Sequence, residues 1–233
     1  GHEASQLAAA LTFKGGCDWF YPYYRDGAFT LALGVTTREH LLSFLARADD
    51  PCSGGRQIPM HYGNKDLRIV SQSSATGTQY LQAVGCAIPR KLENSKEVVY
   101  VSSGEGTTSQ GDFHEALNWA GREKAPVIFH IQDNEYAIST HRSEQTAGSV
   151  FSLVSGYENL SKYQVDGTDF FETHLAFKQA VERARRGKGP SVIVSNVVRL
   201  MPHSSSDDQR KYRTEKSLEE DLKSCLLYTS DAA

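Results

Sequence analysis

Two apolar runs that each end in a polar turn constrain the fold of this chain more than any other feature. Residues 98–101 (VVYV) and 127–131 (VIFHI) have the pattern of buried strands, and residues 112–122 between them have the pattern of a helix. Strands joined through a helix are parallel, and open parallel sheets bind ligands at the carboxyl ends of their strands. We therefore predict an α/β fold, a doubly wound parallel sheet with helices on both faces.

An acid lies in the turn that follows the first of these strands, between two glycines: Gly104, Glu105 and Gly106. A glycine turn at a helix start binds phosphate by itself, but a carboxylate there repels phosphate unless a cation separates the two. Asn134 follows the second strand. Because Mg²⁺ prefers carboxylate and amide oxygens together with phosphate oxygens, the pattern predicts a magnesium–phosphate site at Glu105 and Asn134.

Other classes of protein fit the sequence poorly. Ser109 occupies the third glycine position of a dinucleotide-binding turn, so a nicotinamide dehydrogenase is disfavoured. The Gly-Lys-Ser/Thr of a P-loop is absent as well. The net charge of −3 argues against a nucleic-acid surface. The apolar runs are far shorter than the roughly 20 residues of a membrane span. We expect no nucleic-acid partner and no membrane insertion.

Several motifs in order resemble one family. Gly104-Glu105-Gly106, then 26 residues, then Asp133-Asn134 resembles the thiamine diphosphate motif, in which Asp usually stands at Glu105 and Asn at Asp133. Segments 55–63 (GRQIPMHYG), 136–139 (YAIS) and 199–208 (RLMPHSSSDD) resemble the α subunit of the E1 component of 2-oxoacid dehydrogenase complexes. The branched-chain (2-oxoisovalerate) type is the nearest match, and the resemblance runs from residue 1 to about residue 222.

The resemblance implies an activity and its partners. It implies the thiamine diphosphate-binding fold and oxidative decarboxylation of a branched-chain 2-oxoacid of the 3-methyl-2-oxobutanoate type, in branched-chain amino acid catabolism. The acyl group passes to lipoyllysine on the lipoyl domain of E2. The family takes its activating glutamate from an E1 β subunit, in a heterotetramer, or from a fused β domain, so we expect no turnover by this chain alone. Pyruvate or acetoin dehydrogenase α subunits, and a degenerate non-catalytic binding subunit, remain alternatives.

The resemblance also assigns roles to single residues. Mg²⁺ would be held by Glu105, Asn134 and the backbone carbonyl of Tyr136. His203 would be the catalytic residue, and Ser204 after it is a phosphorylation candidate. The other cofactor-binding positions would be Tyr24, Arg25, Ser74, Thr76, Gly104 and Gly106, with His203 also in contact.

Two further positions depart from the family. A potassium ion is implied at Ser73, Thr78 and Gln79, although Ala75 stands where relatives often have proline. Gln132 stands where the mitochondrial form has an arginine that contacts phosphate. Loss of that charged hydrogen bond would weaken diphosphate binding by about 1.5–3 kcal/mol unless another group compensates.

The remaining chain yields local expectations. We predict a helix over 3–14, with Leu7 and Leu11 on its apolar side. We predict another over 170–186, whose apolar side holds Phe171, Leu175, Phe177, Ala180, Val181 and Ala184. Residues 67–71 read as a short strand, and Thr37 as a helix N-cap.

Length and composition favour one domain, which we assign to residues 1–223, truncated at both ends. Residues 224–233 resemble translated sequencing-adapter sequence, and we expect this tail to be non-native. The four cysteines have no metal or disulfide spacing, which favours reduced thiols and a cytoplasmic location, or the mitochondrial matrix in a eukaryote.

Overall fold

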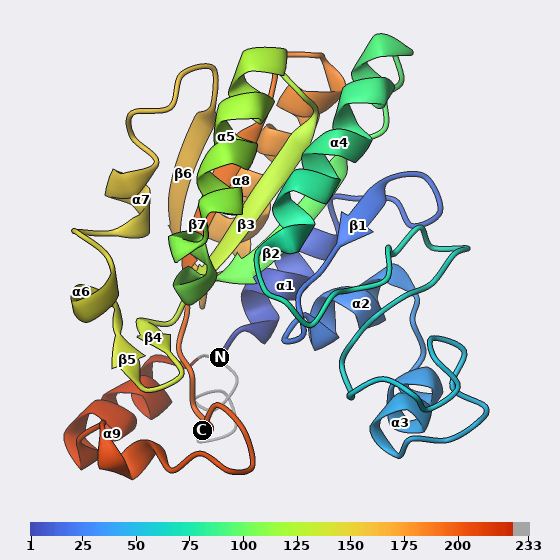
Figure 1. Cartoon of the computed structure of the whole chain (residues 1–233). Helices are drawn as coiled ribbons and strands as arrows, with labels where there is room; N and C mark the ends of the chain where they lie inside the picture. Colours follow the sequence, from blue (N-terminus) through green and yellow to red (C-terminus); the bar gives the residue numbers. More distant parts are fainter. Residues whose placement is uncertain (226–233) are drawn as a thin grey trace.

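Five parallel strands form the central sheet, in the order β1-β2-β3-β7-β6 (Figure 1). The computed structural model describes residues 1–225, and everything below refers to these. The strands are β1 (Trp19–Tyr21), β2 (Val99–Gly104), β3 (Val127–Asp133), β6 (Ser161–Asp166) and β7 (Ser191–Asn196). The pairing of β2 with β3 sets Val99 opposite Val127 and Gly104 opposite Gln132, so both strands end at one edge of the sheet.

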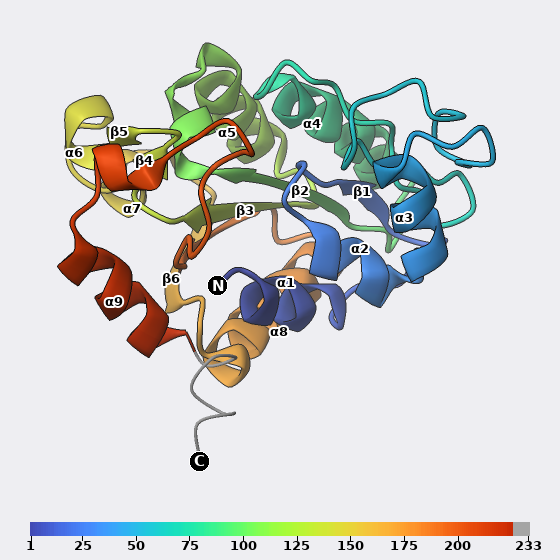
Figure 2. The same ribbon diagram turned by 90° about the horizontal axis from the view of Figure 1, so that it is seen from below.

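Helices cover both faces of the sheet (Figure 2). On one face lie α4 (Thr78–Leu92) and α5 (Gly111–Glu123), and on the other lie α1 (Glu3–Ala10) and α8 (Phe170–Arg185). Buried side chains form one apolar cluster on each face, because successive residues of a strand point to opposite sides. The predicted doubly wound fold is confirmed.

The other elements lie around the ends of the sheet. They are α2 (Gly27–Leu33), α3 (Thr37–Phe44), the 3₁₀ helix η1 (Glu105–Ser109), β4 (Tyr136–Ala137), β5 (Thr140–His141), α6 (Arg142–Gln145), α7 (Val150–Leu153), the 3₁₀ helix η2 (Gln209–Lys211) and α9 (Glu215–Ser224). Strands β4 and β5 form a separate antiparallel pair. The expected non-native tail lies, from residue 226 onward, outside the described residues.

Four local predictions were wrong in detail. The first helix ends at Ala10, and it buries Ser5, Gln6 and three alanines, whereas Leu7 and Leu11 are exposed. In α8 the buried face is centred on Phe177, and Phe171 is 81% exposed. Among the residues predicted on the apolar side of α8, the exposed ones are Phe171 and Leu175. Two helices that pack closely favour small residues at the contact, so the larger apolar side chains lie outside it.

The helix cap and the short strand also differ from expectation. Thr36, not Thr37, caps α3: its hydroxyl accepts from the Glu39 amide at 3.2 Å, and Glu39 Oε2 accepts from the Thr36 amide at 2.6 Å. This is a capping box, which requires Glu three residues after the cap. In the region 67–71 only Ile69 pairs, through isolated bridges to Phe20 and Asn64.

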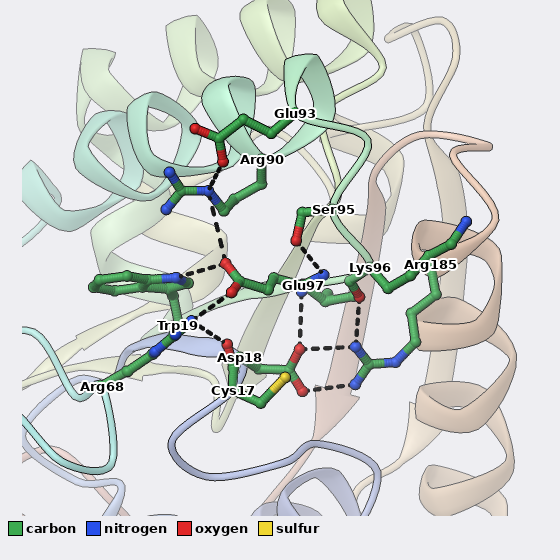
Figure 3. Close-up of polar contacts among 11 residues, drawn as sticks. Cys17, Asp18, Trp19, Arg68, Arg90, Glu93, Ser95, Lys96, Glu97 and Arg185 are labelled. Carbon is green, nitrogen blue, oxygen red and sulfur yellow. Dashed lines mark hydrogen bonds and ion pairs between the residues drawn. The ribbon is translucent and has the colours of Figure 1, made fainter.

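A cluster of charged side chains ties the amino ends of β1 and β2 to α8 (Figure 3). The Asp18 carboxylate is fully buried and binds the Arg185 guanidinium through two hydrogen bonds of 2.8 and 2.6 Å. It also accepts from the amide of Val98 at 2.9 Å. Glu97 binds Arg68 at 2.7 Å and the indole of Trp19 at 3.1 Å. These contacts join four separate segments of the chain at the amino end of the sheet.

Replacing Asp18 by alanine is expected to lower the free energy of unfolding by roughly 3 kcal/mol, because it leaves Arg185 partly buried and several donors without an acceptor. Chemical denaturation followed by circular dichroism measures this. Asp208→Ala is the control, since Asp208 pairs with the largely exposed Arg210 and such pairs contribute little. Equal midpoints for the two variants would show that the cluster adds nothing to stability.

Candidate active site

A cavity of about 260 Å³ opens at the carboxyl ends of β2 and β3. Its lining comes from five separate parts of the chain: the loop after β1, the segment before α4, the turn after β2, the turn after β3 and the loop after β7. The lining residues are Tyr24, Arg25, Thr76, Gly104, Glu105, Gly106, Thr107, Asn134, Tyr136, Ala137, Ile138 and His203. The sheet therefore brings together most of the residues that the sequence singled out.

Glu105 is the acid of this cavity, and only 3% of it is exposed. Its Oε2 accepts a hydrogen bond from the Asn134 amide at 3.2 Å, whereas its buried Oε1 has no hydrogen-bond partner among residues 1–225. Burial, and next the nearby carboxylate of Asp133, raise the pKa of Glu105. A buried carboxylate oxygen without a partner is costly, and a cation would satisfy it. The residues present therefore fit a bound divalent metal ion.

Asn134 and Tyr136 lie opposite Glu105 in a tight turn. Asn134 Oδ1 accepts from the Tyr136 amide at 3.1 Å, and Glu135 between them has a left-handed backbone with φ of 68°. Gly106 allows this turn to approach closely, since a Cβ at Gly106 would lie 2.6 Å from the Cβ of Ala137. The second glycine of the motif is thus required by packing, which places the Tyr136 backbone beside η1.

Tyr24 and Arg25 supply the hydrogen-bonding side chains of the opposite wall. The Arg25 guanidinium lies 5.1 Å from the centre of the Tyr24 ring, a cation–π contact. The backbone carbonyl of Arg25 accepts from Gln6 Nε2 at 3.0 Å, which fixes this segment against α1. A planar guanidinium at this position is suited to bind two phosphate oxygens at once.

His203 enters the cavity from the loop after β7. Its ring lies edge-on to that of Tyr24, with the two centres 6.1 Å apart. Its amide donates to Asp207 Oδ2 at 2.8 Å, which closes the loop on itself. Burial, and then the positive charges of Arg25 and Arg199, lower the pKa of His203 below the ordinary histidine value of about 6.5. The imidazole is therefore neutral at pH 7 and able to accept a proton.

Tyr212 links that loop to the body of the protein. Its hydroxyl donates to Asp207 Oδ2 at 2.6 Å and accepts from Arg199 Nη2 at 2.7 Å. Arg199 is 4% exposed and also donates to the carbonyl of Ile138 at 2.8 Å. Arg199 and Asp207 therefore order the loop.

Replacing Tyr212 by phenylalanine removes both hydrogen bonds and is expected to destabilise the His203 loop locally by about 1–2 kcal/mol. Amide hydrogen exchange over residues 200–212 should rise roughly tenfold, while exchange in the sheet stays unchanged. Tyr163→Phe is the matched control, because Tyr163 lies on β6 away from this loop. Unchanged exchange in the loop would exclude this role for Tyr212.

Several predicted positions lie outside the cavity lining. Ser74 is exposed, and its hydroxyl lies 2.6 Å from His61 Nε2. In the predicted potassium segment, Ser73 and Thr78 bond to the backbone of Ala75, and the Gln79 oxygen accepts from the Gly77 amide. These bonds lie at or just before the start of α4, and potassium at Ser73, Thr78 and Gln79 stays a prediction. Ser204 is exposed beside His203.

Two arginines that support the site were not predicted from the sequence. Arg142 forms an ion pair with Asp133, the residue before Asn134. Arg213 is buried, and its guanidinium lies 5.1 Å from the centre of the Tyr136 ring. Both come from segments without a periodic pattern, so only the fold shows their position.

Comparisons with known proteins identify the relatives of the chain. The sequence profile of the family described as dehydrogenase E1 component matches residues 1–226. The 2-oxoisovalerate dehydrogenase subunit alpha of Bacillus subtilis is 43% identical over 233 residues, which is 100% of this chain and 70% of that protein. The protein of the same name from Pseudomonas aeruginosa is 34% identical over 214 residues, 91% of this chain and 52% of its own length.

Two further relatives broaden the comparison. The pyruvate dehydrogenase E1 component subunit alpha of Staphylococcus aureus is 36% identical over 215 residues, covering 92% of this chain and 55% of that protein. A solved structure from Mycobacterium smegmatis, described as a thiamin diphosphate-dependent enzyme, covers 84% of this chain and 32% of its own, with a TM-score of 0.52 and 17% identity, and so shares the fold. The profile match over nearly the whole chain and the identity to the Bacillus protein lead to one conclusion: this chain belongs to the dehydrogenase E1 component family.

Proposed function

We propose that this chain is the α part of a thiamine diphosphate-dependent E1 enzyme that decarboxylates a branched-chain 2-oxoacid. The acyl group would pass to lipoyllysine on E2. The substrate is chosen from the names of the relatives, because the Bacillus and Pseudomonas proteins are both 2-oxoisovalerate dehydrogenase α subunits. The chain spans 70% of the first of these and about half of the second, so the activity of the whole enzyme is part of the proposal.

One observation carries the proposal: the buried, unpartnered Oε1 of Glu105 lies in a cavity that also holds an arginine, an asparagine and a histidine. A carboxylate alone would repel a diphosphate. With Mg²⁺ between them, the same carboxylate supports diphosphate binding, and Arg25 on the other wall supplies a positive charge. This donor set suits a metal-bound diphosphate and not a free phosphate.

The residues of the chain would divide the work as follows. Glu105, Asn134 and the backbone carbonyl of Tyr136 would hold Mg²⁺, and Tyr24 and Arg25 the diphosphate. Thiamine diphosphate, when bound, would supply the carbanion chemistry needed to decarboxylate a 2-oxoacid. His203, neutral at pH 7 and fixed by its loop, would move a proton at the reacting group and position the incoming acyl acceptor.

The partners and the location belong to the same proposal. The enzyme would need an E1 β subunit, or a fused β domain, to supply the activating glutamate, and the lipoyl domain of E2 as acceptor. The described part of the chain has no helix that could cross a membrane. With bacterial relatives, we propose a cytoplasmic location.

The test combines the chain with a β subunit of a 2-oxoisovalerate dehydrogenase and adds thiamine diphosphate and Mg²⁺. We expect decarboxylation of 3-methyl-2-oxobutanoate at least tenfold faster, in kcat/KM, than that of pyruvate, because one or two methylenes in a pocket alter the free energy by about 1–3 kcal/mol. Neither the α chain nor the β subunit alone should turn over. A preference for pyruvate would support the second candidate, a pyruvate dehydrogenase α subunit, and a complex that binds no cofactor would refute both.

A further inference from the structure

Gln132, the last residue but one of β3, is fully buried and does not line the cavity. Its Nε2 donates to Asp26 Oδ1 at 2.6 Å, and its Oε1 accepts from Gln6 Nε2 at 2.9 Å. The Gln6 amide is itself oriented by the backbone, since Nε2 also donates to the Arg25 carbonyl at 3.0 Å and Oε1 accepts from the Ala28 amide at 3.2 Å. The two ends of the Gln132 amide are thus fixed from both sides.

His2 continues this chain of hydrogen bonds. Its Nδ1 lies 2.8 Å from Gln132 Oε1, which only accepts, so Nδ1 carries the hydrogen. Its Nε2 lies 3.5 Å from Asn134 Nδ2, which only donates, so Nε2 carries none. The ring is therefore neutral and in the Nδ1–H tautomer.

The Asn134 side-chain amide has the orientation that pairs with this tautomer of His2. Its Nδ2 faces His2, and its Oδ1 accepts from the Tyr136 amide at 3.1 Å. We propose that Gln132 and His2 are positioning residues that hold the Asn134 side chain with its oxygen, and not its NH₂ group, available to the metal ion. This inference rests on the proposed function, in which Asn134 binds Mg²⁺.

The relay gives Gln132 a role within the protein. Its side-chain amide is bonded to Asp26, Gln6 and His2. A reversed Asn134 amide would direct two N–H donors at the cation. Residues that orient metal ligands typically alter metal affinity 10- to 100-fold when they are replaced, so an effect of this size is expected here.

Two substitutions of Gln132 separate the relay from simple packing. Gln132→Met keeps the length of the side chain but removes the acceptor for His2, whereas Gln132→Glu keeps an oxygen acceptor at that place. Long-range ¹H–¹⁵N spectra of the chain labelled with ¹⁵N-histidine report the tautomer of His2, assigned with His2→Ala. Calorimetry of the α/β complex reports the affinity for thiamine diphosphate with Mg²⁺.

In the wild type and in Gln132→Glu we expect His2 in the Nδ1–H form. In Gln132→Met we expect the Nε2–H form, with Mg²⁺-dependent affinity lowered at least roughly tenfold. His2→Ala, which leaves β3 intact, should lower the affinity similarly, so the inference stays testable if Gln132→Met does not fold. An Nδ1–H tautomer retained in Gln132→Met, or wild-type affinity in His2→Ala, would overturn it. A wild-type complex that binds no cofactor would refute the proposed function instead, and the tautomers would still decide the relay.

Discussion

Replacing Glu105 by alanine is expected to lower the affinity for thiamine diphosphate in the presence of Mg²⁺ by at least ~100-fold. The reason is that Glu105 is the one acid that lines this cavity, and even residues that only orient a metal ligand alter affinity 10- to 100-fold. Calorimetry of the α/β complex with and without Mg²⁺ measures the effect. Glu115→Ala, an exposed carboxylate on α5, is the matched control and should bind as the wild type does. Mg²⁺-dependent binding that survives in Glu105→Ala would remove Glu105 from the metal site.

The Glu105 carboxylate, which should favour cofactor binding, should lower the stability of the cofactor-free fold at neutral pH. Burial, and next Asp133, raise the pKa of Glu105 above the ordinary glutamate value of 4.5. A raised pKa means that the group's contribution to stability is fully present below pH 4.5 and is lost as the pH rises through the folded-state value. Without cofactor, Glu105→Gln should therefore melt at or above the wild-type temperature at pH 7.5, and the difference should vanish near pH 4.5. A lower melting temperature at pH 7.5 would contradict this account.

Replacing His203 by alanine is expected to slow acyl transfer to a lipoyl domain by about 10²- to 10⁴-fold, the range typical of a lost general acid or base. Binding of thiamine diphosphate should weaken far less, because Arg25 and the metal ligands remain. Since burial, Arg25 and Arg199 lower the pKa of His203, the wild-type rate should fall only below pH 6.5, as the imidazole becomes protonated.

Single-turnover kinetics from pH 5.5 to 8 test this second prediction. The acidic limb of the rate profile should disappear in His203→Ala together with the loss of rate. Ser206→Ala, an exposed residue of the same loop, should keep both the rate and the limb. A variant that loses rate but retains the acidic limb would assign the proton to another group.

The central unit was predictable because its signals are local. The alternation of apolar runs with glycine and asparagine turns placed Glu105 and Asn134 at the ends of neighbouring strands, and the structure has them 3.2 Å apart, side chain to amide. Tyr24 and Arg25 are about 80 residues away in sequence, and nothing local shows that β1 pairs with β2. Their place in the cavity came from the family resemblance, and their roles as ligands remain predictions.

The failures have physical causes. In α1 the leucines suggested the buried face, whereas the helix buries alanines. In α8 the prediction was wrong at Phe171 and Leu175, which are exposed, because the buried face is centred on Phe177. At Gln132 the strand directs the side chain towards α1 and Asp26, and the weaker diphosphate binding stays a prediction. The cap at Thr36 could have been predicted from the sequence, because Glu39 stands three residues after it, as a capping box requires.

The charged cluster around Asp18 and Glu97 lies at the end of the sheet opposite to the cavity. The strands are therefore held together at the end of the sheet away from the cavity, and the loops that carry Glu105 and His203 project from their carboxyl ends. Substitutions meant to change the accepted substrate can therefore be confined to these loops, while the opposite ends of the strands stay unchanged. Mutational libraries confined to the loops should tolerate many more changes than libraries that include the charged cluster around Asp18 and Glu97. The same difference in tolerance should hold during evolution.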